Sequence, residues 1–588
     1  MIKLFKNLTK KDYIIILLCI VLIVAQVWLD LKLPDYMSKI TTLIQTSGTK
    51  TIDILIQGGY MLLCALGSLI SAVIVGYLAA TLSSNFSMVL REKIFTKVNK
   101  FSTAEMKKFQ TSSLITRTTN DVTHMEMLIS MGLQAIIKAP ILAVWAVSKI
   151  LNKSLELSML TGACVLALLI SIFIIVVIVL PRFSIIQKLI DKMNGVVREN
   201  LTGIRVIRAF NAEKLQENRF NTVNDELTSN QLFSQKAFAF LMPIMSFVMS
   251  FLSLGIYFVG AYLIQNAGLA DKITIFSNVI VFLSYGMQVI MAFLMLAIIF
   301  MLMPRASISA KRINEVLEEE INIIDGNFDG ETKEKGIVEF KNVSFKYPDA
   351  DEYLLRNISF KANKGETVAF IGSTGSGKSS LINLIPRFYD VTDGEIFIDG
   401  VEIKDYKLSS LRNKLGYVSQ KAFMFTGSVN ENVRYGNNGE KKPDKEAIKE
   451  AIKVAQGTSF VEKMDKQYDS NIARGGTNVS GGQKQRLSIA RAIVRNPEIY
   501  IFDDTFSALD FKTDSLLRKE LKKHTKDATC LIVAQRIGTI IGADKIIVLD
   551  KGKCAGIGTH KELIENCDVY KEIALSQLSE EELGNVKK

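Results

Sequence analysis

One stretch of the sequence decides the fold, and it reads Gly372-Ser373-Thr374-Gly375-Ser376-Gly377-Lys378-Ser379. It follows a short apolar run at 367–371 and precedes a helical pattern that begins at Ser380. Glycines let the backbone approach a ligand closely, and the free N–H groups at the start of a helix attract anions. The stretch therefore predicts a phosphate-binding loop between a strand and a helix, with Lys378 on the β- and γ-phosphates of ATP and Ser379 on Mg²⁺.

Two further segments extend this site. The apolar run 499–502 is typical of a buried strand, and Asp503 and Asp504 follow it directly. Asp503 is predicted to contact Mg²⁺, either directly or through a water molecule. Upstream, Val479-Ser480-Gly481-Gly482-Gln483 precedes a helical run at 484–491. The serine and glycines are thus expected at a helix N-terminus, where N–H groups and the helix dipole favour an anion.

The first half of the chain has a different composition. Hydrophobic residues make up 48% of the 588 residues and concentrate before residue 305. Six stretches are long enough to cross a bilayer, which takes about 20 residues each, and they lie at 13–34, 54–82, 127–150, 156–181, 238–265 and 276–303. Four lysines precede the first stretch, as the positive-inside rule expects of a cytoplasmic N-terminus. The net charge of +12 is assigned to this arrangement, because no basic helix or aromatic platform indicates nucleic-acid binding.

These patterns predict a multidomain membrane protein. An all-α transmembrane domain of six membrane helices, with two long cytoplasmic hairpins, is expected at 1–310, and a charged linker follows at 311–335. A P-loop α/β nucleotide-binding domain is expected at 336–575, and a frayed or disordered tail at 576–588. The six cysteines show no CxxC pair, so reduced thiols are expected rather than disulfides or zinc.

The phosphate-binding loop, the Ser-Gly-Gly-Gln segment and the strand ending in Asp503 together resemble the nucleotide-binding domain of ABC transporters. The resemblance spans almost the whole chain, because residues 199–210 resemble the segment before a coupling turn of ABC exporters and residues 114–121 resemble the other coupling turn. It implies that the hairpin at 182–237 crosses to the nucleotide domain of a partner.

The resemblance also implies roles for single residues. Tyr347 would stack on adenine, Gln420 would sense the γ-phosphate and belong to the metal site, and Asp510 would face the opposite subunit. The segment from Ser480 to Gln483 would bind the γ-phosphate of ATP held by the other subunit. The full set expected to contact nucleotide is Tyr347, Gly372, Ser373, Thr374, Gly375, Ser376, Gly377, Lys378, Ser379, Ser380, Ser480, Gly481, Gly482, Gln483 and Asp510.

Two positions depart from the family pattern. Asp504 stands where a catalytic Glu is expected, and its carboxylate is set back by about 1 Å, a misplacement that can cost about 10²-fold in rate. Gln535 stands where the switch histidine is expected, and an amide can donate a hydrogen bond but cannot carry a proton. Asp504, Gln535 and Gln420 are therefore the candidate catalytic residues of a degenerate site.

The chain thus resembles one subunit of a bacterial heterodimeric ABC exporter of the multidrug type. This implies an ATP-hydrolysing translocase of the cell membrane, weak or inactive alone, which needs ATP, Mg²⁺ and a partner half with intact Glu and His. The cargo would be an amphipathic or hydrophobic compound. Two alternatives stay open at this point: a slow homodimeric exporter, and an ATP-binding membrane regulator that transports nothing.

One ionisable residue stands inside a predicted membrane span. Lys138 lies in a long apolar run, two residues before Pro140. Such a residue is a functional candidate by default. A lysine can also extend its ammonium to the membrane boundary, and we expect Lys138 to reach the cytoplasmic boundary in this way.

Overall fold

The computed structural model describes residues 2–6, 8–46, 48–151, 154–268, 271–436 and 442–578. The expected tail at 576–588 lies outside these residues from position 579 onward. The described chain forms two compact units. The first contains Met1–Asn99 and Thr111–Glu319, and the second contains Lys100–Gln110 and Glu320–Lys588.

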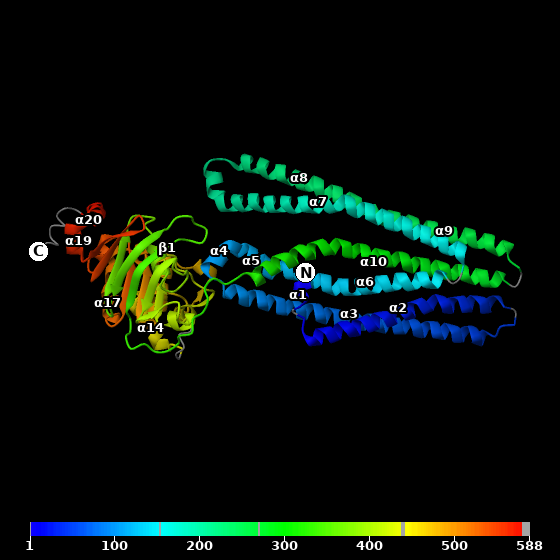
Figure 1. Ribbon diagram of the computed structural model, residues 1–588, viewed down its shortest axis with the longest axis horizontal. Helices are drawn as coiled ribbons and strands as arrows, with labels where there is room; N and C mark the ends of the chain where they lie inside the picture. Colours follow the sequence, from blue (N-terminus) through cyan, green and yellow to red (C-terminus); the bar gives the residue numbers. More distant parts are fainter. Residues whose placement is uncertain are drawn as a thin grey trace. The chain divides into compact units, whose positions relative to one another are not determined.

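The first unit consists of long helices (Figure 1). Their bounds are α1 (Ile2–Phe5), α2 (Lys10–Gln45), α3 (Thr51–Asn99), α5 (Thr111–Thr118), α6 (Asn120–Leu151), α7 (Leu155–Ala209), α8 (Glu213–Ala239), α9 (Leu241–Asn266) and α10 (Lys272–Glu318). Among the described residues, six helical stretches are long and apolar enough to cross a membrane. Five of the six predicted spans lie within one of these stretches, whereas the sixth, at 276–303, lies within α10 but runs past the apolar stretch, which ends at Leu296. The helices α2, α3, α7 and α10 continue well beyond the expected spans, and α2, α7 and α10 do so past the internal prolines Pro34, Pro181 and Pro304.

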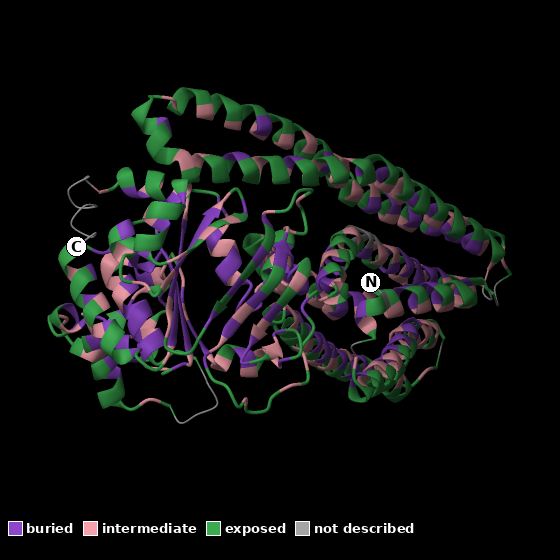
Figure 2. Cartoon of the chain, turned by 60° about the vertical axis from the view of Figure 1, so that its left-hand side comes forward, coloured by how far each residue is buried: buried purple, intermediate pink, exposed green. Residues whose placement is uncertain are grey.

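Within this unit, α2, α6, α7, α9 and α10 pack around one apolar core, to which α3 adds Val75. Its fully buried members include Val27, Ala146, Phe282 and Val289. The α7–α8 hairpin is largely exposed along its length (Figure 2), with only Val223 and Ser234 buried on α8. Residues 199–210 occupy the end of α7, just before the turn, as their resemblance implies.

The first cytoplasmic turn differs from expectation. Residues 114–121, which resemble a coupling turn, are helical and belong to α5 and the start of α6. The turn is made instead by the short helix α4 (Thr103–Phe109), which packs with the second unit. Ser102 caps α4, and the Glu105 side chain accepts from the backbone N–H of Ser102 at 2.5 Å. This capping box starts a new helix and so moves the turn upstream of the predicted segment.

The second unit is an α/β domain built on two larger sheets. The antiparallel sheet has the order β2-β1-β4-β5, with β1 (Val338–Phe345), β2 (Leu355–Ala362), β4 (Asp393–Ile398) and β5 (Val401–Glu402). The other sheet has the order β12-β11-β3-β10-β9-β6, with β3 (Thr367–Gly372), β6 (Leu415–Val418), β9 (Ile499–Asp503), β10 (Thr529–Val533), β11 (Lys545–Asp550) and β12 (Lys553–Gly558). A short pair, β7 (Gly427–Ser428) and β8 (Asn471–Ile472), completes the strands of the described residues.

Helices cover the second sheet and supply its core. The helices are α11 (Lys378–Asn383), α12 (Leu408–Asn413), α13 (Val429–Val433), α14 (Lys445–Val454), α15 (Thr458–Val461), α16 (Gly481–Ile493), α17 (Phe511–His524), α18 (Ile537–Ile540), α19 (His560–Asn566) and α20 (Asp568–Leu575). Every residue of β9 and β10 is buried, and Figure 2 shows the strands as the most buried part of this unit. Burial on both faces explains why these strands read as continuous apolar runs.

The parallel register places four strand ends together. β3, β10, β9 and β6 are neighbours and parallel, with Val533 opposite both Phe370 and Asp503, and Val418 opposite Phe502. Loops that follow these strands must therefore leave from one edge of the sheet. Ligands of open parallel sheets bind outside the carboxyl ends of the strands.

We predict that Phe340→Ala destabilises the second unit by about 3–5 kcal/mol. The ring is buried in β1 and stacks on Phe360 with centroids 4.5 Å apart, so its removal leaves a cavity in the core. Thermal unfolding of the purified full-length chain, followed by circular dichroism, measures the change. Phe511→Ala is the matched control, because that ring is 80% exposed, and its melting temperature should stay near that of the parent chain. Equal shifts in the two variants would contradict the assignment of the core.

Candidate nucleotide site

The loop after β3 has the geometry of a phosphate cradle. Gly375 and Gly377 have φ angles of +85° and +96°, a left-handed backbone that other residues rarely adopt. A Cβ at Gly375 would meet nothing within 4 Å, whereas a Cβ at Gly377 would collide with the side chain of Leu355. The loop therefore stays tight against the domain and open on the other side, which fits a bound phosphate group.

Lys378 lies inside this loop. Its ammonium donates hydrogen bonds to the carbonyl oxygens of Gly372 and Ser373, at 2.9 and 2.8 Å. Burial lowers the pKa of Lys378, while the charges of Asp504 and Asp503 act in the opposite direction. The ammonium is thus held by weak neutral acceptors, which a phosphate oxygen can replace with a stronger charge-assisted bond.

Ser379 and Asp503 meet across the sheet edge. The Ser379 hydroxyl, at the start of α11, donates to Asp503 Oδ1 at 2.7 Å. Burial raises the pKa of Asp503, the Ser379 hydrogen bond and the charge of Lys378 lower it, and the neighbouring Asp504 raises it. A hydroxyl and a carboxylate oxygen are ligands that Mg²⁺ accepts, and this ion usually takes its other ligands from phosphates and water. Among the described residues, no group of three or more His, Cys, Asp or Glu side chains is arranged to hold a metal ion.

Asp504 is the centre of a hydrogen-bonded group. Its backbone has φ 46° and ψ 33°, a left-handed conformation at the end of β9, and its side chain is buried. Gln535 Nε2 donates to Asp504 Oδ2 at 2.8 Å, and Gln420 Nε2 donates to the same oxygen at 3.1 Å. The structure therefore brings together all three candidate catalytic residues, which come from the ends of β9, β10 and β6.

A residue near the C-terminus positions Gln535, and no sequence pattern points to it. Gln577, just after α20, donates to the backbone oxygen of Gln535 at 2.8 Å and accepts from the backbone N–H of Ile537 at 2.9 Å. These bonds fix the loop that carries the Gln535 amide. No motif marks Gln577, because its partners are backbone groups that only the folded chain brings near.

Tyr347 lies beside the phosphate loop. Its hydroxyl is 2.8 Å from the hydroxyl of Ser380, and its ring meets Phe345 and Tyr389 edge to face. The ammonium of Lys107 from α4 lies 4.6 Å from the centre of the Tyr347 ring. Sequence reasoning missed Lys107, since neighbouring lysines on a short polar helix carry no pattern that points to an aromatic ring.

The Ser-Gly-Gly-Gln segment forms the start of α16. The Ser480 side chain accepts from the Gln483 N–H at 3.3 Å, and the Gln483 side chain accepts from the Ser480 N–H at 2.9 Å. A Cβ at Gly481 would meet nothing within 4 Å, so the surface in front of this helix is open. Within the described chain, the hydrogen bonds of the Ser480 and Gln483 side chains stay in this capping box and do not reach the phosphate loop.

Asp510 has a local role in the single chain. It caps α17, and its carboxylate accepts from the N–H of Thr513 at 3.0 Å. Hydrogen bonds from Thr513, followed by the more distant Arg486 charge, lower the pKa of Asp510. Asp510 therefore stays ionised and exposed at the surface near α16.

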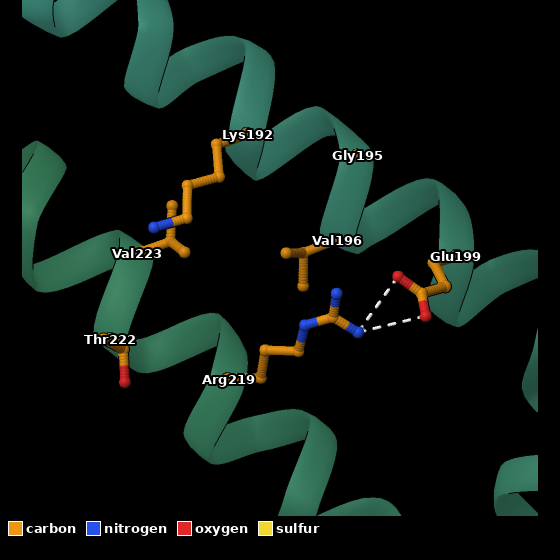
Figure 3. A pocket seen from close by; sticks show the side chains of 7 residues that line it. All are labelled: Lys192, Gly195, Val196, Glu199, Arg219, Thr222 and Val223. Carbon is orange, nitrogen blue, oxygen red and sulfur yellow. Dashed lines mark hydrogen bonds and ion pairs between the residues drawn. The ribbon is translucent and has the colours of Figure 1, made fainter.

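A separate pocket of about 380 Å³ lies between α7 and α8 (Figure 3). Gly195 leaves space on α7, and Arg219 closes one end through a two-pronged ion pair with Glu199, with both oxygens at 3.0 Å. The pocket contains none of the residues predicted for nucleotide binding. Because the cation of Arg219 is already paired, the pocket is read as part of the hairpin's packing.

The comparisons with known proteins agree with this geometry. Residues 355–507 match the ABC transporter family, and residues 16–293 match the ABC transporter transmembrane region. An ABC transporter ATP-binding protein of Mycobacterium bovis is 36% identical over 90% of this chain and 89% of its own length.

The chain belongs to the ABC transporter family.

Other ABC transporters and one solved structure extend the comparison. The ATP-binding protein YfiB of Bacillus subtilis is 34% identical, with 90% of each chain covered. The ATP-dependent lipid A-core flippase of Haemophilus influenzae is 31% identical over 86% of this chain and 84% of its own length. The structure of a bacterial Atm1-family ABC exporter with ATP bound has a TM-score of 0.81 at 24% identity and covers 97% of this chain and 99% of its own. The fold is therefore that of an ABC exporter half: a helical transmembrane domain followed by a cytoplasmic ATP-binding domain in a multi-pass membrane protein.

We predict that Lys378→Ala weakens ATP binding to this chain by about 10²-fold, because charge-assisted hydrogen bonds contribute about 1.5–3 kcal/mol each. Titration of the purified chain with a fluorescent ATP analogue measures the effect. Lys364→Ala is the control, since that lysine is exposed in the turn before β3 and its loss should leave affinity unchanged. Unaltered binding by Lys378→Ala would refute the placement of the phosphates in this loop.

Proposed function

We propose that this chain is one half of an ATP-driven exporter and that its own ATP site is the slow site of an unequal pair. ABC exporters act as dimers, either of two different halves or of two copies. The observation that carries the proposal is the state of Asp504, the residue at the position of the catalytic carboxylate, which both Gln535 and Gln420 bind through one oxygen.

The hydrogen bonds explain why this site would turn over slowly. A carboxylate oxygen has two lone pairs, and the two amides occupy both on Asp504 Oδ2, so only Oδ1 is left to accept from the attacking water. A group that activates or positions the attacking water needs a free acceptor within hydrogen-bond reach of it. Asp504 is also one methylene shorter than Glu, and Gln535 supplies an uncharged donor where a histidine could carry charge. Each feature works against hydrolysis, while the phosphate loop, Ser379 and Asp503 keep the parts needed to bind ATP.

The Ser-Gly-Gly-Gln segment at the start of α16 supports the proposal that this chain works in an unequal pair. The start of α16 keeps its capping box and stays open to solvent, so its N–H groups and dipole can face an anion supplied from outside this chain. In a pair with a partner that carries Glu and His, Ser480 to Gln483 would complete the partner's site. Closure of the two nucleotide domains on ATP would favour one state of the membrane helices over the other.

We further propose an amphipathic or hydrophobic cargo. The membrane helices are long and apolar, and one relative, the lipid A-core flippase, is named for a lipid that is itself amphipathic.

Lys107 over the Tyr347 ring adds a physical route for communication, because α4 would sense occupancy of the adenine platform directly.

The decisive experiment compares ATP turnover of the chain alone with turnover of the chain co-expressed with a second exporter half that carries Glu and His at the positions of Asp504 and Gln535. We expect little turnover alone and rapid turnover for the pair. In the pair, Ser480→Arg should nearly abolish turnover because it blocks the partner's site, whereas Lys378→Ala should leave a substantial fraction. Vigorous hydrolysis by the chain alone would favour the homodimeric exporter. Normal pair turnover without transport into inverted vesicles would favour the regulator.

A second prediction concerns the Asp504 group itself. The double variant Asp504→Glu with Gln535→His should raise turnover of the chain alone by about 10²-fold or more, because it restores the reach of the carboxylate and a chargeable partner. The rate of phosphate release from the purified chain is the measurement. Addition of Lys378→Ala to the double variant is the control and should return turnover to background. No gain in the double variant would mean that another feature limits hydrolysis.

A further inference from the structure

A charge pair lies among the membrane helices of the first unit. The ammonium of Lys138, on α6, is 3.2 Å from Asp30 Oδ2, on α2. The two side chains are 18% and 24% exposed, so the pair is mostly enclosed but still accessible. Lys138 therefore does not extend alone to the membrane boundary, as the sequence suggested. At about 1.5 Å per residue, both residues lie about 20 Å from the exterior ends of their helices.

Other polar groups converge on the same place. Ser68, on α3, donates to Asp30 Oδ1, and the Gln288 amide, on α10, donates to the backbone oxygen of Asp30 at 3.4 Å. The Gln288 side-chain oxygen is buried and has no hydrogen-bond partner within the described chain. Four helices that are otherwise apolar thus each contribute one polar group to a single site, which we call the charge-pair site (Asp30, Ser68, Lys138 and Gln288).

This site has unused binding capacity. An ammonium can donate three hydrogen bonds, and the one ion pair recorded for Lys138 uses a single carboxylate oxygen. The Gln288 oxygen is a further acceptor without a donor. Charged groups are expensive within a bilayer and usually mark a pathway or a ligand site, and an enclosed ion pair is often no more stable than apolar residues of the same volume. Helix packing alone therefore does not account for the presence of this ion pair.

We propose that the charge-pair site binds the head group of a zwitterionic amphiphile. This inference rests on the proposed exporter function and names the chemistry of its cargo. A head group with both charges can exchange partners with the pair: its cation replaces Lys138 on Asp30, and its anion takes the ammonium of Lys138. Both enclosed charges stay compensated throughout. A ligand with a single charge either leaves the pair intact and makes one new contact, or displaces one member and leaves the other unpaired, which carries a large desolvation penalty.

A second pair on the same helices provides a matched control. Lys149 lies 2.9 Å from Asp35, and the buried hydroxyl of Tyr285 donates to the other Asp35 oxygen at 2.9 Å. Lys149 is two residues from the end of α6, so this pair lies nearer the exterior surface. The carboxylates of Asp30 and Asp35 are each engaged on both oxygens, so the two pairs differ in their depth along the helices, and Lys149 serves as the matched control for Lys138.

The chain also carries its own reporters. Trp28 and Trp145 are its only tryptophans. Trp28 is two residues from Asp30 on α2, and Trp145 is two helical turns from Lys138 on α6. Tryptophan fluorescence of the full chain therefore reports on these two helices without any label.

The experiment titrates the full chain, in the uncharged detergent dodecyl maltoside and without nucleotide, with three amphiphiles of equal chain length. These are dodecyl betaine, dodecyltrimethylammonium and dodecyl sulfate. We expect the zwitterion to bind about tenfold more tightly than either singly charged probe, since only it compensates both charges. Equal binding of the three probes, or no binding of the zwitterion, would overturn the proposal.

Single substitutions should shift the preference in opposite directions. Asp30→Asn leaves the ammonium and should favour dodecyl sulfate, whereas Lys138→Gln leaves the carboxylate and should favour dodecyltrimethylammonium. Lys149→Gln should keep the preference for the zwitterion. A purely structural pair would lower stability without any change of preference. If a single variant fails to fold, the double variant Asp30→Asn with Lys138→Gln decides, because it has no enclosed charge and should bind all three probes alike.

The readout is separate from the proposed exporter function. Amphiphile binding is measured without ATP, whereas the exporter proposal fails through nucleotide turnover and vesicle transport. A chain that prefers the zwitterion but drives no transport would keep this site and lose the exporter assignment. A chain that drives transport without any charge preference would do the reverse.

Discussion

The parallel register of β3, β10, β9 and β6 is the constraint on which the nucleotide site depends. Backbone hydrogen bonds hold Val533 level with Phe370 on one side and with Asp503 on the other. The phosphate loop, Gln535, the two aspartates and Gln420 all follow these strands, so they must leave the sheet at one edge. A slip of one residue in any of these strands would turn its side chains to the opposite face and would separate Ser379 from Asp503.

The same edge explains how two substitutions act as one. Asp504 and Gln535 are 31 positions apart in sequence, but neighbouring strands bring the amide onto the carboxylate. Gln420 arrives from the next strand and binds the same oxygen. The three residues thus form a closed hydrogen-bonded group around a left-handed backbone turn, while the binding half of the site keeps its usual parts. The phosphate loop and the Asp504 group therefore lie at a single edge of the sheet.

The transmembrane domain is held together in a different way from the nucleotide-binding domain. Its helices are apolar for most of their length, and their packing is set by shape rather than by polarity. Two ion pairs join α2 and α6 in this bundle: Asp35 with Lys149 near the exterior ends, and Asp30 with Lys138 deeper along the helices. Enclosed charges in such a bundle must be compensated, and this requirement links the character of any ligand there to the character of the pair. In both the nucleotide site and the charge-pair site, a carboxylate on one element of the fold is bound by side chains from other elements.

Much of this protein could be predicted from sequence because its signals are local. Six apolar stretches, a glycine-rich loop after a strand and a serine at a helix start each follow from residues close in the chain. The first cytoplasmic turn was misplaced because a capping box at Ser102 and Glu105 competes with a family-like segment a few residues on. Asp30 could have been found by the rule that singled out Lys138, but its pairing with Lys138 could not, since 108 positions separate them.

Residue patterns alone predicted the membrane part and the ATP-binding part of the chain, and they singled out Asp504 and Gln535 as departures from the family pattern that the chain resembles. Only the tertiary structure decided that both amides converge on one oxygen of Asp504, that Gln577 holds the Gln535 loop, that Lys107 lies over Tyr347, and that Lys138 is paired. The physical reason is the distance in sequence between the residues that interact. Motifs report short-range propensity and backbone geometry, whereas hydrogen bonds and ion pairs between distant residues depend on strand register and helix packing, which only the folded chain sets.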